Sequence, residues 1–241
     1  MSHDESTVRA LQRVGVHIVA RARIEATGRF SLRVSPGGFA TPEFGPDLRR
    51  VGVSGTALFV ESDRPGGAEC RAMPIAGASL RELASFAEVD LSDSIGVGDD
   101  TPDVGDIDAP IAVDDATARA VAGWHSKVAQ ALVRFAMALP ATAGPTLARL
   151  WPEHFDIAFD AAAPSGLRAN FGGSPGDGFH PAPYLYAGPW TDARPGDRLR
   201  ARLAERMQAM EASAPQVPAG ESLTYGSDPL QKLDFYKAEG R

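Results

Sequence analysis

The sequence predicts an α+β protein in which helices pack against antiparallel strands. Residues 114–139 place apolar side chains at helical spacing, which predicts one long amphipathic helix. Short runs of alternating apolar and polar residues, bounded by Gly and Pro, predict strands joined by tight turns. An acidic Gly/Pro-rich stretch over 91–113 separates these features. We therefore expect two small mixed halves, residues 1–90 and 114–241, joined by an acidic linker.

The N-terminal half begins with a predicted helix over residues 6–26, since Val8, Leu11 and Ile18 share one face. Residues 29–34 alternate as a strand and end at a turn over 35–38 that contains Pro and two Gly. The remaining elements expected in this half are strands at 50–53, 57–61 and 70–74, a hairpin turn at 64–67 and a helix near 79–88.

The linker is defined by its charge. No Lys or Arg occurs between Leu83 and Ala118, and this stretch holds the acids Glu88, Asp90, Asp93, Asp99, Asp100, Asp103, Asp106, Asp108, Asp114 and Asp115. Its centre, residues 94–110, is rich in Gly and Pro and has no aromatic residue, which predicts a mobile segment without apolar anchors. The spacing of its acids does not match an EF-hand calcium loop.

The C-terminal half opens with the long helix, which Asp114 can cap and Pro140 ends. A hairpin follows, with Phe155, Ile157 and Phe159 on one face and a return strand over 167–171. If the strands pair near Ala161 and Leu167, then Asp160 lies beside Arg168. The elements expected after it are a strand at 183–186, an amphipathic helix at 199–210 and a last helix over 228–238.

Composition excludes several classes of function. Mean hydropathy is -0.16 and no apolar run is long enough to span a membrane, and the polar, acidic start predicts no signal peptide. The net charge of -7 argues against nucleic-acid binding, and the single cysteine, Cys70, excludes a disulfide framework. We expect a cytoplasmic protein whose partner is a small molecule or another protein, with a homodimer as one arrangement.

The loop over 170–190 is the predicted site. Its several Gly and Pro residues favour a rigid irregular loop, and rigid loops with polar groups are where binding sites concentrate. We expect this loop to form a ligand site against the helix over 121–139. The candidate ligand-binding residues are Asn170, Ser174, Asp177, His180, Tyr184, Tyr186, Trp190 and, from the helix, His125, for which the apolar face of the helix favours a core role.

A serine-hydrolase interpretation of the same loop fails on physical grounds. Residues 172–176 match the G-x-S-x-G pattern around Ser174. The residue after the nucleophile must donate its backbone N–H to the oxyanion hole, and here that residue is Pro175, which has none.

Two alternatives remain open. The first is a metal-dependent hydrolase that holds a divalent metal such as Zn, Mn or Fe on His154, Asp156, Asp177 and His180, since the first two share one strand face. These side chains can also be solvated or paired with arginines, because their spacing matches no recognised metal motif. The second alternative is a structural homo-oligomer with no ligand.

Three motifs carry a resemblance to other proteins. They are TGRFSLRVSPGGFATP at 27–42, LWPEHFD at 150–156, and SPGD at 174–177 followed by HPAPYLY at 180–186. With these motifs the chain resembles a family of uncharacterised proteins of high-GC, actinobacterial-type bacteria, and the excess of Arg over Lys is typical of such genomes. The order of elements is also similar to a broader bacterial domain family of unknown function. Neither resemblance implies an activity or a catalytic residue.

Overall fold

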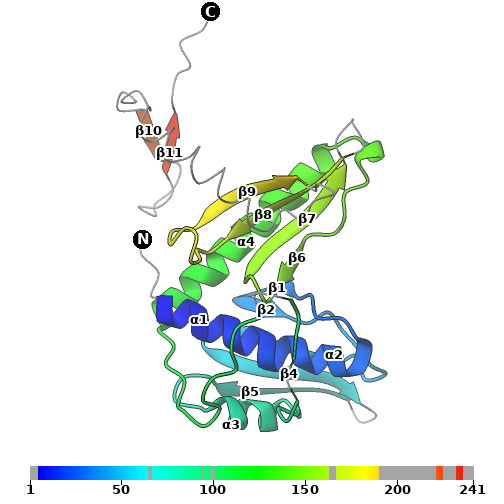
Figure 1. The fold of residues 1–241 in the computed structure, drawn as a ribbon, viewed down its shortest axis with the longest axis vertical. Helices are drawn as coiled ribbons and strands as arrows, with labels where there is room; N and C mark the ends of the chain where they lie inside the picture. The colour runs from blue at the N-terminus through cyan, green and yellow to red at the C-terminus, as the bar shows by residue number, and fades with distance from the viewer. Residues whose placement is uncertain are drawn as a thin grey trace, which may run out of the picture. The chain divides into compact units, whose positions relative to one another are not determined.

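The computed structural model describes residues 5–64, 67–93, 95–98, 101–162, 167–189, 221–224 and 232–235. It has helices and antiparallel sheets, so the predicted α+β class is confirmed (Figure 1). Contacts divide the chain into two compact units, Met1–Trp190 and Thr191–Arg241, and each is treated by itself. No helix within the described ranges is long and apolar enough to cross a membrane.

The N-terminal helix is continuous but changes its winding. It consists of α1 (Glu5–Val14), a π-helical segment η1 (Gly15–Ala20) and α2 (Arg21–Thr27), and it ends where Gly28 adopts φ 69°. The helix expected over 6–26 is therefore confirmed. Every residue of η1 is buried, and this segment contacts β3 of the first sheet and α3.

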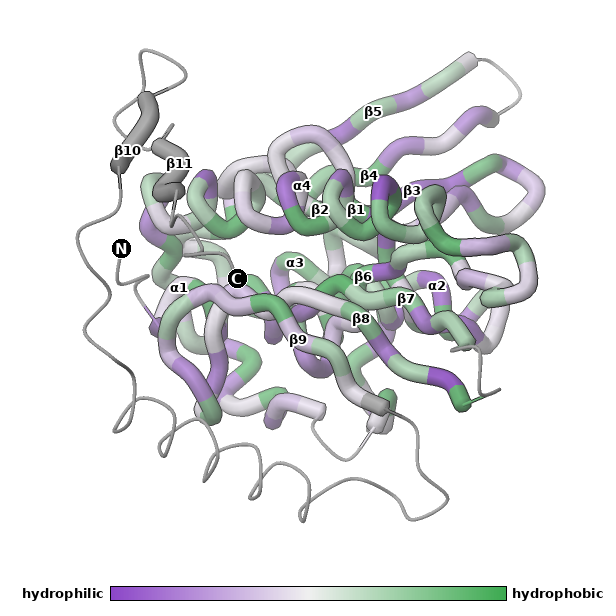
Figure 2. The backbone as a smooth tube through the Cα atoms, turned by 90° about the horizontal axis from the view of Figure 1, so that it is seen from above, coloured by the Kyte–Doolittle hydropathy of each residue, from purple (hydrophilic) through white to green (hydrophobic). Residues whose placement is uncertain are grey.

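The first sheet is an antiparallel meander in the order β1-β2-β3-β4-β5. The strands are β1 (Arg33–Ser35), β2 (Gly38–Ala40), β3 (Arg50–Ser54), β4 (Ala57–Arg64) and β5 (Gly67–Pro74). The strands expected at 50–53, 57–61 and 70–74 are confirmed, and Arg64 pairs with Gly67 across the expected hairpin turn. Figure 2 shows the ends of β4 and β5 extending beyond the rest of this sheet.

The strand expected over 29–34 is shorter than predicted, because Leu32 joins a different strand. Leu32 and Leu150 form an antiparallel bridge, with backbone N–H to O distances of 2.8 and 3.0 Å. This bridge connects the first sheet to a second sheet in the order β6-β7-β8-β9. Its strands are β6 (Arg149–Trp151), β7 (Asp156–Ala162), β8 (Arg168–Ser174) and β9 (Tyr184–Pro189).

The acidic segment follows α3 (Leu80–Phe86), whose start is fixed by a capping box between Ser79 and Glu82. The described part of the segment lies against the N-terminal helix. Arg13 donates to the carbonyls of Val104 and Asp106, and the Nε2 of His17 donates to the carbonyl of Pro102 at 2.8 Å.

Apolar side chains of the acidic segment reach the protein interior as well. Val97 and Ile111 are buried, and Val104 and Ile107 pack against the hydrophobic core. The premise of a mobile linker, that the stretch has no apolar anchors, is therefore wrong.

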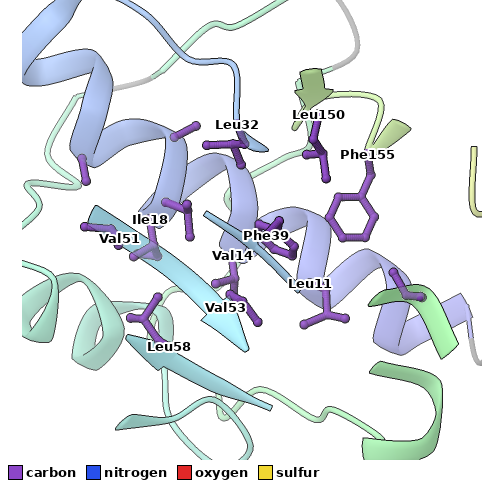
Figure 3. Packing of buried hydrophobic residues seen from close by; sticks show 14 of the residues in the cluster. Leu11, Val14, Ile18, Leu32, Phe39, Val51, Val53, Leu58, Leu150 and Phe155 are labelled. Carbon is purple, nitrogen blue, oxygen red and sulfur yellow. The ribbon is translucent and has the colours of Figure 1, made fainter. Parts of the chain in front are cut away.

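The helix α4 (Asp115–Ala138) begins at the Asp114 cap as expected and is followed by a short 3₁₀ turn, η2 (Ala141–Ala143). It contacts β1 and β2 as well as β7 and β8, so it packs on both sheets. Residues from before and after the acidic segment share one core, and Figure 3 shows Val14 of the helix beside Phe39 and Leu11 near Phe155. The chain therefore divides into compact units after Trp190 rather than at residues 91–113.

The second unit is described only at β10 (Glu221–Thr224) and β11 (Lys232–Phe235), which pair antiparallel. The last helix expected over 228–238 is wrong at Lys232–Phe235. There Leu233 and Phe235 alternate with polar residues, which is the period of a strand. The helix expected at 199–210 and the candidate residue Trp190 lie outside the described residues.

Candidate functional site

The second sheet has two chemically different faces. Ile157, Phe159 and Ala161 of β7 are buried on the face that packs against α4. Asp156 and Asp160 point to the opposite face, which we call the outer face, because side chains alternate along a strand. A Cβ atom added to Gly173, which pairs with Ile157, would meet Val128 of α4, and this agrees with the assignment of the two faces.

Strand register brings several candidate residues together on the outer face. Asp156 lies one step beyond the Ile157–Gly173 pair and therefore beside Ser174, which pairs with Tyr184. Tyr186 pairs with Gly172 in the neighbouring row. We call the following residues the tyrosine–aspartate cluster: Asp156, Ser174, Asp177, Tyr184 and Tyr186.

Asp156 is the deepest member of the cluster. It is 7% exposed, and its Oδ2 accepts a hydrogen bond from the hydroxyl of Tyr186. Its Oδ1 is buried and has no hydrogen-bond partner among the described residues. Burial raises the pKa of Asp156, and the nearby charge of Asp177 acts in the same direction, while the Tyr186 hydrogen bond and His154 act against the shift.

The position of Tyr186 depends on the absence of a side chain at residue 172. A Cβ atom at Gly172 would lie 2.4 Å from the Cζ of Tyr186 and 2.7 Å from the carbonyl oxygen of Ile157. The ring of Tyr186 therefore passes directly over the β8 backbone to reach Asp156. Gly172 is needed here for close approach, which is one of the few reasons for glycine within a strand.

Asp177 organises the turn between β8 and β9. Its Oδ1 accepts the backbone N–H groups of Phe179 and His180, both at 2.9 Å, and its Oδ2 accepts the Tyr184 hydroxyl at 2.6 Å. Burial, followed by hydrogen bonding to Asp177, raises the pKa of Tyr184. Tyr184 is thus a neutral donor to Asp177 near neutral pH.

Ser174 is buried, and its Oγ accepts the backbone N–H of Gly176 at 3.1 Å. Hydrogen bonding to Ser174 acts against the rise in the pKa of Tyr184, so the hydroxyl faces the cluster. Within the described residues 175–189 no helix follows Ser174, which agrees with the rejection of a serine nucleophile at this position.

The proposed metal ligands are not brought together. His154 is exposed, and its Nε2 lies 4.0 Å from the Oε1 of Glu153. The Nδ1 of His180 donates to the carbonyl of Ala182 at 2.8 Å. Within the described ranges, no three His, Cys, Asp or Glu side chains form a group that could hold a metal ion. The expected convergence of His154, Asp156, Asp177 and His180 on a divalent metal is therefore wrong.

The expected ligand site between the loop and His125 is not formed, although β8 packs on α4 through Phe171 and Gly173. His125 of α4 is fully buried on the other side of the sheet, where its Nε2 donates to the carbonyl of Phe155 at 3.0 Å. Burial lowers the pKa of His125 to about 4. His125 is a core residue, whereas Asn170 lies on the outer face, further along β8 and paired with Gly188.

One outer-face neighbour was missed by sequence reasoning. Trp151 of β6 pairs with Asp156, so its ring belongs to the same face, and it is half-buried with an edge contact to Phe30 at 5.6 Å. No pattern in the sequence distinguishes Trp151 from an aromatic residue of the core. The turn over 152–155 could have indicated this position, because it reverses the chain direction and pairs Trp151 with Asp156.

A separate hollow lies away from the cluster. It is open, with a volume of about 530 Å³, and is lined by Thr7, Ala76, Gly77 and residues 110–114. Its lining is mainly apolar and backbone, so it offers less specific chemistry than the outer face.

Comparisons of the chain with protein-family models, with curated proteins and with solved structures find no significant match.

Proposed function

We propose that the protein is a binding protein whose site is the tyrosine–aspartate cluster, and that the ligand is a small molecule or a segment of a partner that donates hydrogen bonds. The observation that carries this proposal is the buried, unpartnered Oδ1 of Asp156. Leaving such a group unsatisfied costs about 1–3 kcal/mol. A donor from outside the described residues explains why the fold retains it.

The rest of the cluster supports the same proposal. Two tyrosine hydroxyls already donate to two carboxylates, and Ser174 adds a third hydroxyl. A carboxyl group whose pKa is shifted by burial, next to convergent polar groups, is typical of functional sites. The absence of a metal-binding group among the described residues disfavours the hydrolase alternative.

A homodimer is a second candidate, favoured by a different observation. The last part of α4 exposes Val133 and Met137, which are four residues apart and therefore lie on one face of the helix. Contiguous exposed apolar residues are characteristic of interaction surfaces. Sedimentation velocity at several concentrations tests this candidate, with Met137→Glu as the variant expected to favour the monomer.

We further infer that the protein works in the cytoplasm. The support is that Cys70, the sole cysteine of the sequence, is free and exposed on β5. A free exposed thiol suits a reducing compartment better than an oxidising one.

A thermal-shift screen against a library of metabolites tests the binding proposal. The wild type is compared with Asp156→Asn and with Asp160→Asn, a matched variant on the same strand and face. A stabilisation that is lost in Asp156→Asn and retained in Asp160→Asn supports the site. A screen with no stabilising compound, or stabilisation that persists in Asp156→Asn, contradicts it.

A further inference from the structure

We propose that the cluster binds an organic cation, an ammonium or guanidinium group of a small metabolite, and that this group becomes the counter-ion of Asp156. The inference rests on the proposed binding function and deepens it by naming the class of ligand. It is carried by the contrast between two carboxylates on the outer face of β7.

The first of these carboxylates, Asp160, has its own cation. Arg168 of β8 reaches it with two guanidinium nitrogens, and the same carboxylate lies 3.3 Å from the hydroxyl of Thr146. The ion pair is part-exposed and belongs to the fold. Asp160 therefore needs no ligand.

The second carboxylate, Asp156, is more deeply buried and has no such partner. Its donors are the neutral hydroxyl of Tyr186 and its own backbone N–H, and the charged groups that act on it are His154 and Asp177. Arg149, a cationic residue on the outer face, donates a hydrogen bond to the Oγ of Ser31 rather than to Asp156. A buried carboxylate is stabilised far better by a cation than by neutral donors alone.

The other groups of the site suit a cation and disfavour an anion. Asp177 adds a second negative charge near Asp156, so an anionic ligand would be repelled. The rings of Tyr184 and Tyr186 lie 6.2 Å apart between their centroids, and Trp151 lies beside Asp156. Aromatic faces next to carboxylates are the usual lining of sites for organic cations.

The acceptor that remains in the tyrosine–aspartate cluster also suits a ligand group that only donates hydrogen bonds. Both oxygens of Asp177 are occupied by donors from its own loop and from Tyr184. The acceptor of the cluster without a side-chain partner among the described residues is the buried Oδ1 of Asp156. Ammonium and guanidinium groups carry donors and no acceptor, so they satisfy this atom without leaving a new group unpaired.

Isothermal titration calorimetry with agmatine and putrescine as cations and 1,4-butanediol as the neutral analogue tests the inference. We expect both cations to bind the wild type at low ionic strength and the diol not to bind. Asp156→Asn should weaken cation binding by about 10- to 100-fold, because a charge-assisted hydrogen bond is lost. Asp160→Asn, which has the same net charge as Asp156→Asn, should bind like the wild type.

A second variant keeps the test decisive if Asp156→Asn does not fold. Asp177 is exposed in the loop, so Asp177→Asn should fold and should also weaken cation binding, though by less. Equal affinity of all variants for the cations would show non-specific attraction to an acidic protein and would overturn the inference.

The failures of the two proposals are distinguishable. A neutral library compound whose binding depends on Asp156, together with no binding of agmatine or putrescine, overturns the cation inference and leaves the binding function standing. Asp156-dependent binding of ZnCl₂ or MgCl₂ in place of the organic cations also overturns it. If neither the library nor the cations give any Asp156-dependent binding, both proposals fail.

Discussion

His125 and Asp156 lie on opposite sides of one sheet, and each is a buried polar side chain with one unpaired atom. The Nδ1 of His125 and the Oδ1 of Asp156 both have no partner among the described residues. His125 is enclosed by apolar groups, with the ring of Phe155 at 5.0 Å and a void of about 10 Å³ beside it. Such a void is at the lower limit for a single water molecule, so no ligand fits there.

Asp156 is buried beside the hydroxyl of Tyr186, the ring of Tyr186 contacts that of Tyr184, and the charge of Asp177 acts on the carboxyl group. Burial shifts the pKa of each residue away from its charged form, downward for His125 and upward for Asp156. The comparison teaches that a shifted pKa does not identify a site. The surrounding groups decide whether the unpaired atom belongs to the core or to a binding surface.

The largest expected loss of stability comes from substitution of Phe155, which precedes Asp156 in the chain and packs against His125. Phe155 is 1% exposed, and its ring packs against Phe39 as well as His125. Phe155→Ala should lower the free energy of unfolding by about 3–5 kcal/mol, because it empties a core position. Urea denaturation measures this, with the half-exposed Phe179→Ala as the control that should cost much less. Equal losses in both variants would contradict the assignment of Phe155 to the core.

The next prediction concerns His125 and the loss of stability at acidic pH. The pKa of His125 falls to about 4 in the folded state, so the unfolded chain binds more protons at mildly acidic pH. Stability is fully present above pH 6.5 and is lost as the pH falls towards 4, by about 3 kcal/mol. His125→Gln should remove this part of the acid sensitivity. Urea denaturation of both proteins at pH 7 and pH 4 measures it, and a pH-independent difference would contradict the core assignment.

A smaller effect is expected where Tyr186 crosses β8. Gly172→Ala forces the new Cβ against the Tyr186 ring and the Ile157 carbonyl oxygen, so it should destabilise by about 1–3 kcal/mol. Gly188→Ala on β9 is the matched control, because nothing lies within 4 Å of the added atom. Thermal unfolding of the two variants compares them. A Gly172→Ala protein as stable as the control would mean that Tyr186 does not cover β8.

The smallest expected effect is the pH dependence of stability that Asp156 causes, which has the opposite sign to that of His125. Since the pKa of Asp156 is raised in the folded state, the native protein binds more protons than the unfolded chain from about pH 3.8 upward. This contribution is present below pH 3.8 and is lost as the pH rises through the folded pKa. Asp156→Asn should therefore gain stability relative to the wild type with rising pH. A relative stability that falls with rising pH in urea denaturation would contradict this.

Alternation along single strands allowed part of the site to be predicted. The sequence separates Phe155, Ile157 and Phe159 from Asp156 and Asp160, and the structure has Ile157 and Phe159 against α4 and the two acids on the outer face. It also placed Asp160 beside Arg168, and the ion pair forms although Arg168 pairs with Ala162 in the register. The first inference needed only the two-residue period of a strand. The second rested on a pairing of Ala161 with Leu167 that is wrong, because Ala161 pairs with Ala169.

The remaining features depended on long-range contacts. The contact of Tyr186 with Asp156 requires the order of β7, β8 and β9, which no local pattern contains. The acidic segment was misjudged for a different reason. Its amino-acid composition shows many carboxylates. The segment is held instead through its backbone carbonyls, which accept hydrogen bonds from Arg13, His17 and Arg21 of the N-terminal helix. Carbonyl groups are present in every segment, so composition gives no sign of them.

The most direct test of the central claim is a ¹³C NMR titration of the Asp156 carboxyl, assigned with Asp156→Asn, without and with saturating agmatine. The account predicts a pKa above the ordinary 3.8 for a free aspartate when agmatine is absent. It predicts a clear fall in that pKa when the cation binds, because a positive charge stabilises the carboxylate. An Asp156 pKa that does not change with agmatine, while the Asp177 signal shifts or no signal shifts, would contradict the account.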